Sequence, residues 1–393
     1  MNLKSGVSFD DIAVAFSAKS DAALKKANFL FSVVNQPAIS RLATGSLKLA
    51  LSLRLPVKWI IKNTIFEIFC GGEAIKDCQR TIAKMGEFGI GTILDYSVEG
   101  EKTEEGFDRT RDEILLTIMK AKQDENIPFS VFKVTGLGSF DLMEKVQSGK
   151  KLTGEEQSAF VRLKTRVQMI CQKAFEENIP ILIDAEETWI QNTIDDLVYE
   201  MMVQFNKERA IVYNTFQMYR VDVMQNLKNA FQNAARDGYY LGAKLVRGAY
   251  MEKERERAEE LEHPSPIQPD KNATDENFDN GVKFCIDNKQ RVFLVCGSHN
   301  EYSNYFLAML MEKHSMTNND PRVCFAQLYG MSDNISYNLA KAGYNVAKYV
   351  PYGPVKSVMP YLLRRADENT SIAGQSSREL TLIRKELKRR HSA

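Results

Sequence analysis

Two adjacent arginines near the end of the chain have the residue types and spacing to bind a small anion. In YVPYGPVKSVMPYLLRRADENTS (349–371), a Pro-Gly-Pro turn precedes a predicted helix that carries Tyr361, Arg364, Arg365 and Glu368. Their i, i+3, i+4 and i+7 spacing places these side chains on one helix face. Neighbouring guanidiniums repel each other unless an anion or carboxylates partner them, and arginine matches a carboxylate with two parallel hydrogen bonds. The pattern predicts a clamp for a small carboxylate, although a solvated charged helix face has the same spacing.

The elements that must position this clamp alternate regularly after residue 72. Eight short apolar segments, rich in Val and Ile, are separated by predicted helices, which favours a parallel sheet. Eight such units in roughly 260 residues suit a closed (β/α)8 TIM-type barrel. An open doubly wound sheet is the alternative, but no Gly-rich dinucleotide turn follows the first strand. The strands are expected within 89–99, 128–138, 179–187, 210–219, 240–250, 291–300, 322–331 and 344–353.

Three regions follow from this α/β pattern. Residues 1–72 are expected to form a helical region that packs on the barrel. Residues 73–371 are expected to form the (β/α)8 barrel, and residues 372–393 a basic C-terminal helix.

Charged and polar residues end most of the predicted strands. In a barrel of this type the C-terminal strand ends carry the chemistry. A charge in an apolar barrel mouth costs several kcal/mol unless it is paired, so these residues are expected to compensate one another. There is no Ser-His-Asp order and no nucleophile elbow, so the site is predicted to orient a ligand beside a cofactor that supplies the chemistry. The strand-end residues include Glu99, Lys133, Asp184, Gln217, Lys244, Arg247, Tyr250, Ser298, His299, Asn300 and Tyr349.

Composition limits the other classes of function. The chain has 393 residues, of which 44% are hydrophobic and 26% charged, and its formal charge of +1 gives no argument for nucleic acid binding. Six scattered cysteines are expected to be reduced thiols, and four dispersed histidines predict no metal site. We expect no secretory signal, no transit peptide and no membrane-spanning segment.

Five segments carry a more specific signature: IDAEE (183–187), KLVRGAY (244–250), SHN (298–300), FAQLYGM (325–331) and the 349–371 segment. Together they resemble the proline dehydrogenase family, from about residue 73 to about residue 371. The resemblance implies a (β/α)8 barrel that holds FAD non-covalently at the strand C-termini. It also implies oxidation of L-proline to (S)-1-pyrroline-5-carboxylate by hydride transfer to flavin N5, with the electrons passed to a membrane quinone. That reaction would be the first step of proline catabolism to glutamate.

The resemblance further implies roles for individual residues. Lys133 and the paired arginines would hold the proline carboxylate, Glu99 would pair with the arginines, and Glu368 would hold a ribose of FAD. The expected catalytic residues are Asp184, Lys244 and Tyr349. The expected substrate-binding residues are Glu99, Lys133, Tyr250, Leu328, Tyr349, Tyr361, Arg364 and Arg365. The expected FAD-binding residues are Ala185, Gln217, Arg247, Gly248, Ala249, Ser298, His299, Asn300 and Glu368.

Alternative functions remain open at this point. A hydroxyproline dehydrogenase is one, another flavin barrel such as a folate reductase is a second, and a catalytically silent membrane-associated barrel is a third. Relatives that act on 4-hydroxyproline have a smaller residue at the position of Tyr349, so the tyrosine favours proline. Lys244 occupies a position at which part of the family has arginine. A lysine keeps the positive charge of arginine but cannot donate two parallel hydrogen bonds to one carboxylate. The resemblance covers no aldehyde dehydrogenase domain, so a separate pyrroline-5-carboxylate dehydrogenase is the expected downstream partner.

Quinone use would require contact with a membrane. The basic end KELKRRH (385–391) and the amphipathic stretch 47–69 are the expected contacts. Each Lys or Arg near an anionic surface adds about 1 kcal/mol. We therefore expect a cytoplasmic protein peripherally associated with the respiratory membrane, or with the inner mitochondrial membrane in a eukaryote.

Overall fold

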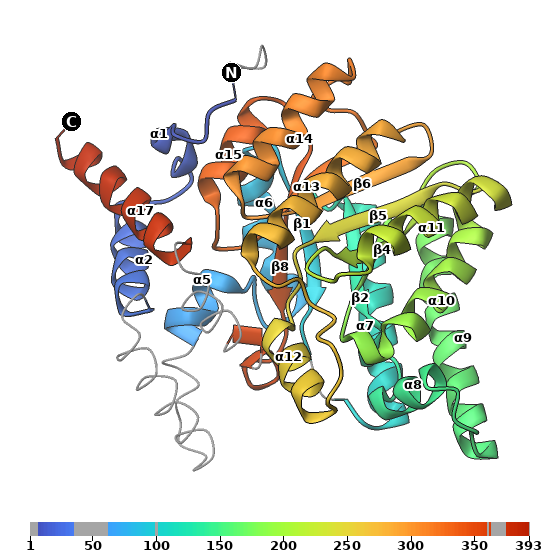
Figure 1. The fold of residues 1–393 in the computed structure, drawn as a ribbon. Helices are drawn as coiled ribbons and strands as arrows, with labels where there is room; N and C mark the ends of the chain where they lie inside the picture. The colour runs from blue at the N-terminus through green and yellow to red at the C-terminus, as the bar shows by residue number, and fades with distance from the viewer. Residues whose placement is uncertain (1–6, 35–61, 99–100, 360, 363–374, 393) are drawn as a thin grey trace.

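The centre of the protein is a closed barrel of eight parallel strands in the order of the chain (Figure 1). The computed structural model describes residues 7–34, 62–98, 101–359, 361–362 and 375–392. The (β/α)8 barrel predicted from the sequence is confirmed, and each strand lies within its expected segment. The strands are β1 (Ile90–Tyr96), β2 (Phe129–Lys133), β3 (Ile181–Asp184), β4 (Val212–Gln217), β5 (Leu241–Val246), β6 (Val292–Gly297), β7 (Val323–Leu328) and β8 (Val346–Tyr352).

The strands are apolar because both of their faces are covered. Strands β4 and β8 are buried at every residue, as expected for parallel strands between a barrel interior and a layer of helices. Successive side chains point to opposite faces, so every second residue enters the interior. The lower interior is filled by apolar residues such as Val131, Leu182 and Ala347, which pack as one cluster. The next inward positions along these strands are Lys133, Asp184 and Tyr349.

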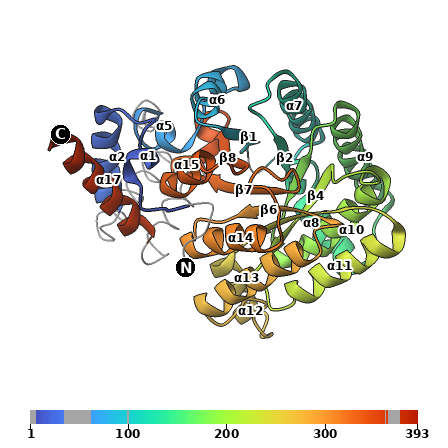
Figure 2. The same cartoon turned by 90° about the horizontal axis from the view of Figure 1, so that it is seen from above.

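An outer ring of helices covers the barrel (Figure 2). Local signals start several of them: Thr153 and Glu156 form a capping box, and Thr103 accepts a hydrogen bond from the amide of Gly106. The ring and its insertions comprise α6 (Gln79–Gly86), α7 (Glu104–Gln123), α8 (Phe140–Gln147), α9 (Gly154–Glu177), α10 (Thr188–Phe205), α11 (Val223–Asp237), α12 (Met251–Glu260), α13 (Lys271–Asp287), α14 (Glu301–Lys313) and α15 (Asp333–Lys341).

The two ends of the chain pack together on one side of the barrel (Figures 1 and 2). Helix α17 (Gln375–His391) lies along α2 (Asp21–Val34) and also contacts α1 (Ile12–Ala15). The shared core includes Phe31, Leu380 and Ile383. The connection back to β1 passes through the short helical turns η1 (Lys62–Phe66), α5 (Glu67–Phe69) and η2 (Ile75–Cys78).

The basic end of α17 is partly neutralised within the protein. Glu386 is fully buried and pairs with both Arg389 and Arg390. Arg390 also pairs with Asp21 and donates to the carbonyl of Phe16. Two of the basic residues in KELKRRH therefore hold the helix in place. Among the residues that the structure describes, no helix is both long and apolar enough to cross a membrane.

Candidate active site

Lys244 lies at the centre of the C-terminal mouth of the barrel. Its side chain projects inward from β5 and is 5% exposed, with Nζ 2.5 Å from Oδ1 of Asp184 on β3. The same Nζ donates to the hydroxyl of Tyr349 on β8, 2.9 Å away. One ammonium thus joins three strands across the barrel. A buried lysine is tolerated here because a carboxylate partners its charge.

Lys133 adds a second cation to this cluster. Lys133 and Asp184 are register neighbours on β2 and β3, and Lys133 Nζ lies 3.9 Å from Oδ2 of Asp184. The Asp184 carboxylate therefore lies near two ammonium groups, and the buried Glu186 also interacts electrostatically with Lys133. Burial, with the nearby Asp184 carboxylate second, raises the pKa of Tyr349 well above its ordinary value, so the phenol keeps its proton at neutral pH.

Leu328 and Tyr361 both pack in the core that the barrel shares with the chain ends. Leu328 is the register partner of Tyr349 and packs against both the barrel interior and the core shared with the chain ends. Tyr361 is 4% exposed and belongs to that shared core. The expected clamp and its partners, Glu99, Arg364, Arg365 and Glu368, lie outside the residues that the structure describes.

A cavity of about 630 Å³ opens beside Lys133 at this mouth. Its wall is formed by the ends of β1 to β3 and by α8 and α12, and Tyr250 at the start of α12 lines it. The lining residues include Tyr96, Lys133, Thr135, Phe140, Glu186 and Tyr250. The cavity combines aromatic surface with charged groups of both signs, which suits a small polar ligand that has an apolar ring. The cluster of Asp184, Lys244 and Tyr349 is not part of its lining.

Glu186 is a buried carboxyl group in the wall of this cavity. It accepts hydrogen bonds from the amide of Thr135, at 3.0 Å, and from the Thr135 hydroxyl, at 2.5 Å. Burial raises the pKa of Glu186 from its ordinary value of 4.5 to about 7, although the bonds from Thr135 oppose the shift. The residue therefore titrates close to neutral pH within the mouth.

The predicted cofactor residues form a second polar group on β5 and β6. Arg247 is held by Asp275, with Nε to Oδ1 at 2.6 Å, and donates to the hydroxyls of Ser298 and Ser303 at 2.8 and 3.0 Å. Its guanidinium also lies over the ring of Phe278, 4.5 Å from the centroid. Arg247 is thus fixed by the protein itself, with its charge at the strand ends.

Gln217 joins the end of β4 to the loop after β5. Its Nε2 donates to the carbonyl of Glu186 at 2.7 Å, and its Oε1 accepts from the amide of Ala249 at 3.4 Å. Gly248 has a φ of +133°, and a Cβ there would come within 2.6 Å of the Tyr219 ring, so only glycine fits. Gly248 and Ala249 are exposed at the mouth, while the neighbouring Ala185 is buried.

The SHN segment lies where β6 leads into α14. Nδ1 of His299 and the hydroxyl of Ser332 are 2.9 Å apart. Asn300 is the N-cap of α14 and accepts from the amide of Ser303, so helix capping already accounts for this asparagine. The structure brings Arg247, Ser298 and His299 into one region, which is adjacent to but separate from the Lys244 cluster.

Lys348 is a buried charge that the sequence analysis overlooked. It precedes Tyr349 on β8 and so faces the helix layer, where it is 1% exposed and pairs with Asp333 at 2.6 Å. Asp333 also pairs with Lys19, which follows α1, at 2.7 Å. Burial, reinforced by Asp333, raises the pKa of the neighbouring Glu379 to about 7. The sequence contains a signal for this buried charge, because Lys348 lies within an apolar predicted strand. Lys133 and Lys244 have the same kind of position.

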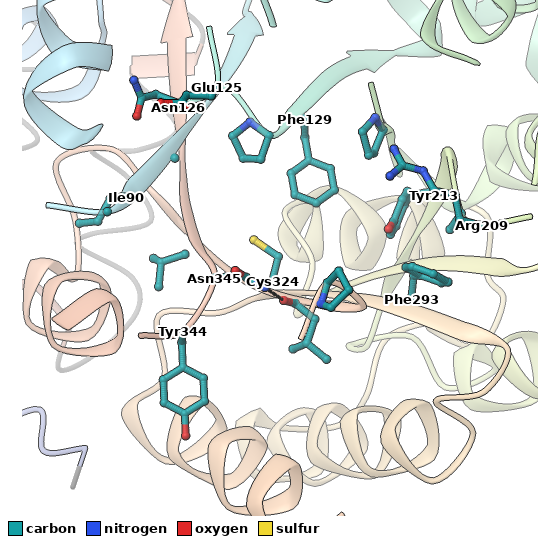
Figure 3. A pocket seen from close by; sticks show the side chains of 18 residues that line it. Ile90, Glu125, Asn126, Phe129, Arg209, Tyr213, Phe293, Cys324, Tyr344 and Asn345 are labelled. Carbon is teal, nitrogen blue, oxygen red and sulfur yellow. Dashed lines mark hydrogen bonds between the residues drawn. The ribbon is translucent and has the colours of Figure 1, made fainter. Parts of the chain in front are cut away.

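The opposite mouth of the barrel has a different character. A cavity of about 700 Å³ lies there, at the N-terminal ends of the strands. Figure 3 shows Phe129, Tyr213 and Cys324 around it, with Arg209 at its edge. The paired charges of the interior are at the other end, where catalytic groups of such barrels are found. Within the described part of the chain, no group of His, Cys, Asp and Glu residues is arranged to hold a metal ion.

Fold and site together define a (β/α)8 barrel enzyme with a charged C-terminal mouth, and comparison with known proteins gives the family. Residues 78–378 match the model of the family described as proline dehydrogenase, so the chain belongs to the proline dehydrogenase family. An enzyme of this family is an oxidoreductase that acts on proline.

Individual relatives agree with this assignment. Proline dehydrogenase 1, mitochondrial, of Dictyostelium discoideum is 32% identical over 92% of this chain and 72% of its own length. The carbapenem antibiotics biosynthesis protein CarD of Pectobacterium carotovorum subsp. carotovorum is 34% identical over 84% of this chain and 85% of its own length.

A solved structure shares the fold. The crystal structure of proline utilization A from Bdellovibrio bacteriovorus, inactivated by N-propargylglycine, superposes with a TM-score of 0.71 over 92% of this chain. The sequence identity is 19%, so this likeness shows the fold alone. The present chain spans 38% of the length of that protein.

The buried Glu186 predicts a pH-dependent stability. The pKa of Glu186 is about 7 in the folded protein and 4.5 as its ordinary value, which applies to the unfolded chain. Between these two pH values the folded protein binds a proton that the unfolded chain has lost. The free energy of unfolding therefore falls as the pH rises from about 4.5 to about 7. Glu186→Gln removes this titration. We expect the variant to gain roughly 2–3 kcal/mol relative to the wild type between pH 4.5 and pH 8, measured by urea unfolding. Exposed Glu208→Gln is the control, and a parallel pH dependence of wild type and Glu186→Gln would contradict the assignment.

Proposed function

We propose that this protein is an FAD-dependent proline dehydrogenase that oxidises L-proline to (S)-1-pyrroline-5-carboxylate, the first step of proline catabolism to glutamate. The observation that carries the proposal is the cluster of Lys133, Asp184, Lys244 and Tyr349 at the C-terminal mouth of a barrel from the proline dehydrogenase family. It supports the proposal because it combines positive charge with a fixed aromatic ring, the features that a ring amino acid with a carboxylate would need.

The carboxylate of proline would be held by Lys133 together with Arg364 and Arg365. Lys133 lies 3.9 Å from Asp184 at the mouth, where its ammonium group could donate a charge-assisted hydrogen bond to the substrate carboxylate. A charge-assisted hydrogen bond contributes roughly 1.5–3 kcal/mol, and several of them would fix the orientation of the substrate. Glu99 would pair with the arginines in the absence of substrate.

The rest of the mouth would enclose the proline ring. Tyr349, Tyr361, Tyr250 and Leu328 would supply the apolar surface, and the buried Tyr349 and Tyr361 would keep water away from the reacting carbon. Hydride loss from the carbon beside nitrogen needs a neutral amine, because only a nitrogen lone pair can form the imine product. Asp184, Lys244 and Tyr349 are the proposed catalytic residues, which form the rigid floor against which the ring is oriented.

The hydrogen bond from Lys244 bears on the choice of substrate. Because it holds the hydroxyl of Tyr349, the ring cannot easily turn aside to admit a 4-hydroxyl group on the substrate. This supports proline over 4-hydroxyproline, and a hydroxyproline dehydrogenase is the second candidate. A relative named for antibiotic biosynthesis matches 84% of this chain, and the spectrum described below distinguishes the two candidate substrates.

The polar group on β4 to β6 fits an FAD molecule. Arg247, Ser298 and His299 offer donors near the exposed backbone of Gly248 and Ala249, which suits phosphate and ribose oxygens. Gln217 and Ala185 would contact the isoalloxazine, Asn300 the adenine half, and Glu368 a ribose. Bound FAD would supply the hydride acceptor of the reaction.

A membrane quinone is the proposed final electron acceptor, which implies peripheral contact with the respiratory membrane. Lys385 and Lys388 on α17 are exposed, unlike the buried apolar face of this helix. They could approach anionic lipid without unfolding the helix. The stretch 47–69 is the other proposed contact, and residues 47–61 lie outside the described part of the chain. The product would be used by a separate pyrroline-5-carboxylate dehydrogenase.

A flavin spectrum tests cofactor and substrate together. We expect the purified protein, supplied with FAD, to show a flavin absorbance band at about 450 nm. This absorbance should bleach when L-proline is added in the absence of oxygen. Bleaching by 4-hydroxyproline should be much slower, since Tyr349 opposes it. A protein that binds no flavin would rule out the proposed function, and equal rates with both substrates would favour the second candidate.

Removal of the clamp should weaken substrate binding selectively. We expect KM for proline to rise by about 10- to 100-fold in each of three variants: Lys133→Met, Arg364→Met and Arg365→Met. The reason is that each variant loses one charged hydrogen bond to the substrate carboxylate. Flavin absorbance should persist, because these residues are assigned to the substrate. Lys102→Met, on the exposed rim of the same cavity, is the control. Unchanged KM in all three variants would contradict the clamp.

The membrane contact can be tested by charge reversal. The double variant Lys385→Glu with Lys388→Glu should bind less to vesicles that contain anionic lipid, in a sedimentation assay, and equally to zwitterionic vesicles. Deletion of the whole helix is a poor test, because it would also remove the buried Glu379, Leu382 and Ile383. Undiminished binding of the double variant would exclude α17 as the contact.

A further inference from the structure

Helix α17 contacts the loops that follow both β6 and β7, although it lies far from them in the sequence. Arg378 forms two bonds to Glu301, the first residue of α14, with Nε to Oε1 at 3.0 Å and Nη2 to Oε2 at 3.2 Å. Asn334 on α15 donates to the same Glu301 at 2.8 Å. Figure 2 shows α17 beside α15, with α14 next to it. The starts of two barrel helices are thus joined by the C-terminal helix.

Glu379 holds a strained turn at the start of α15. Its Oε1 accepts a hydrogen bond from the amide of Ser332 at 2.5 Å. Ser332 has a φ of +51°, a left-handed conformation that is unfavourable for a side chain other than glycine or asparagine. The conformation therefore has to be maintained by contacts, and the buried bond from Glu379 is one that a distant helix provides.

The turn at Ser332 in turn sets the position of His299. The Ser332 hydroxyl lies 2.9 Å from Nδ1 of His299. This hydrogen bond occupies one of the two ring nitrogens and orients the plane of the imidazole. The one hydroxyl proton of Ser336 is donated to Gln327 at 2.8 Å, and the carbonyl of Ser332 lies farther away, at 3.3 Å. Gln327 donates to the carbonyl of Ser298, the residue before His299. The direct contact between Ser332 and His299 is therefore the path that leads from the turn to the SHN segment.

Buried charges keep Glu379 in this position. Lys19 and Lys348 attract the Glu379 carboxylate, and they also partner Asp333, whose like charge opposes that of Glu379. Glu379 is 5% exposed, so it cannot rotate into water without breaking the packing of α17. Because a buried carboxyl group needs its hydrogen bond, the bond to Ser332 stabilises both partners.

We infer that Glu379 is a positioning residue for the cofactor site, and that it acts through the turn at Ser332 on the imidazole of His299. The C-terminal helix thereby sets how tightly the protein holds FAD, without contacting it. This inference rests on the proposed function for its cofactor, but the link from Glu379 to His299 exists in the protein alone.

The test uses the full-length protein and two readouts. The FAD dissociation constant is measured by flavin fluorescence quenching, and His299 is titrated by NMR of the apoprotein, in which only four histidines contribute signals. Glu379→Ala is expected to weaken FAD binding by about tenfold, because one buried hydrogen bond is lost. It should also change the pKa and the tautomer ratio of His299. Glu379→Gln keeps an acceptor oxygen for Ser332 and should restore both values. Exposed Arg384→Ala, on the same helix, should leave both unchanged.

Ser332→Ala provides the second variant, in case Glu379→Ala does not fold. It removes the hydroxyl that contacts His299 but keeps the amide bond to Glu379, so it should change the His299 titration and weaken FAD binding. A variant that loses thermal stability while FAD affinity and His299 stay as in the wild type would overturn the inference. If the wild type binds no FAD, the proposed function fails instead, and an unchanged His299 titration in both variants would still disprove the link.

Discussion

The need to compensate a buried ammonium group determines the arrangement of this barrel mouth. Lys244 projects into an interior that is otherwise apolar, and its charge is tolerated only because Asp184 accepts it and Tyr349 bonds it. The three residues come from β3, β5 and β8, so closure of the barrel is a condition for the pairing. Lys133 adds a second ammonium group beside the same Asp184 carboxylate.

A second buried ion network lies behind the first, on the other face of β8. Tyr349 points inward to Lys244, and Lys348 points outward to Asp333, because neighbouring side chains of a strand alternate. The outer network extends to Lys19 and to Glu379, and so it joins the two ends of the chain to the barrel. One strand thereby connects the proposed catalytic floor with the segments that lie outside the barrel.

The proposed cofactor side depends on a different kind of support. Arg247 is held by Asp275, Ser298 and Ser303, and His299 by Ser332. These partners belong to helices and turns behind the strand ends, which keep the side chains in single orientations. Such support agrees with a site that binds and orients ligands, since a pre-ordered site loses less entropy when they arrive.

The sequence alone determined the barrel and most of the residues at its mouth. Strand–helix alternation predicted all eight strands, because parallel strands buried on both faces are continuously apolar, and the family motifs identified the strand-end residues. The family motifs and the predicted strand ends proposed Asp184, Lys244 and Tyr349 as catalytic residues and Lys133 as a substrate-binding residue. Only the tertiary structure decided that Lys244 is the residue that joins Asp184 to Tyr349, and that Lys348, Lys19 and Glu379 form a network. Those contacts link positions up to several hundred residues apart, and no local periodicity encodes a pairing that exists only when the barrel has closed and the chain ends have packed against it.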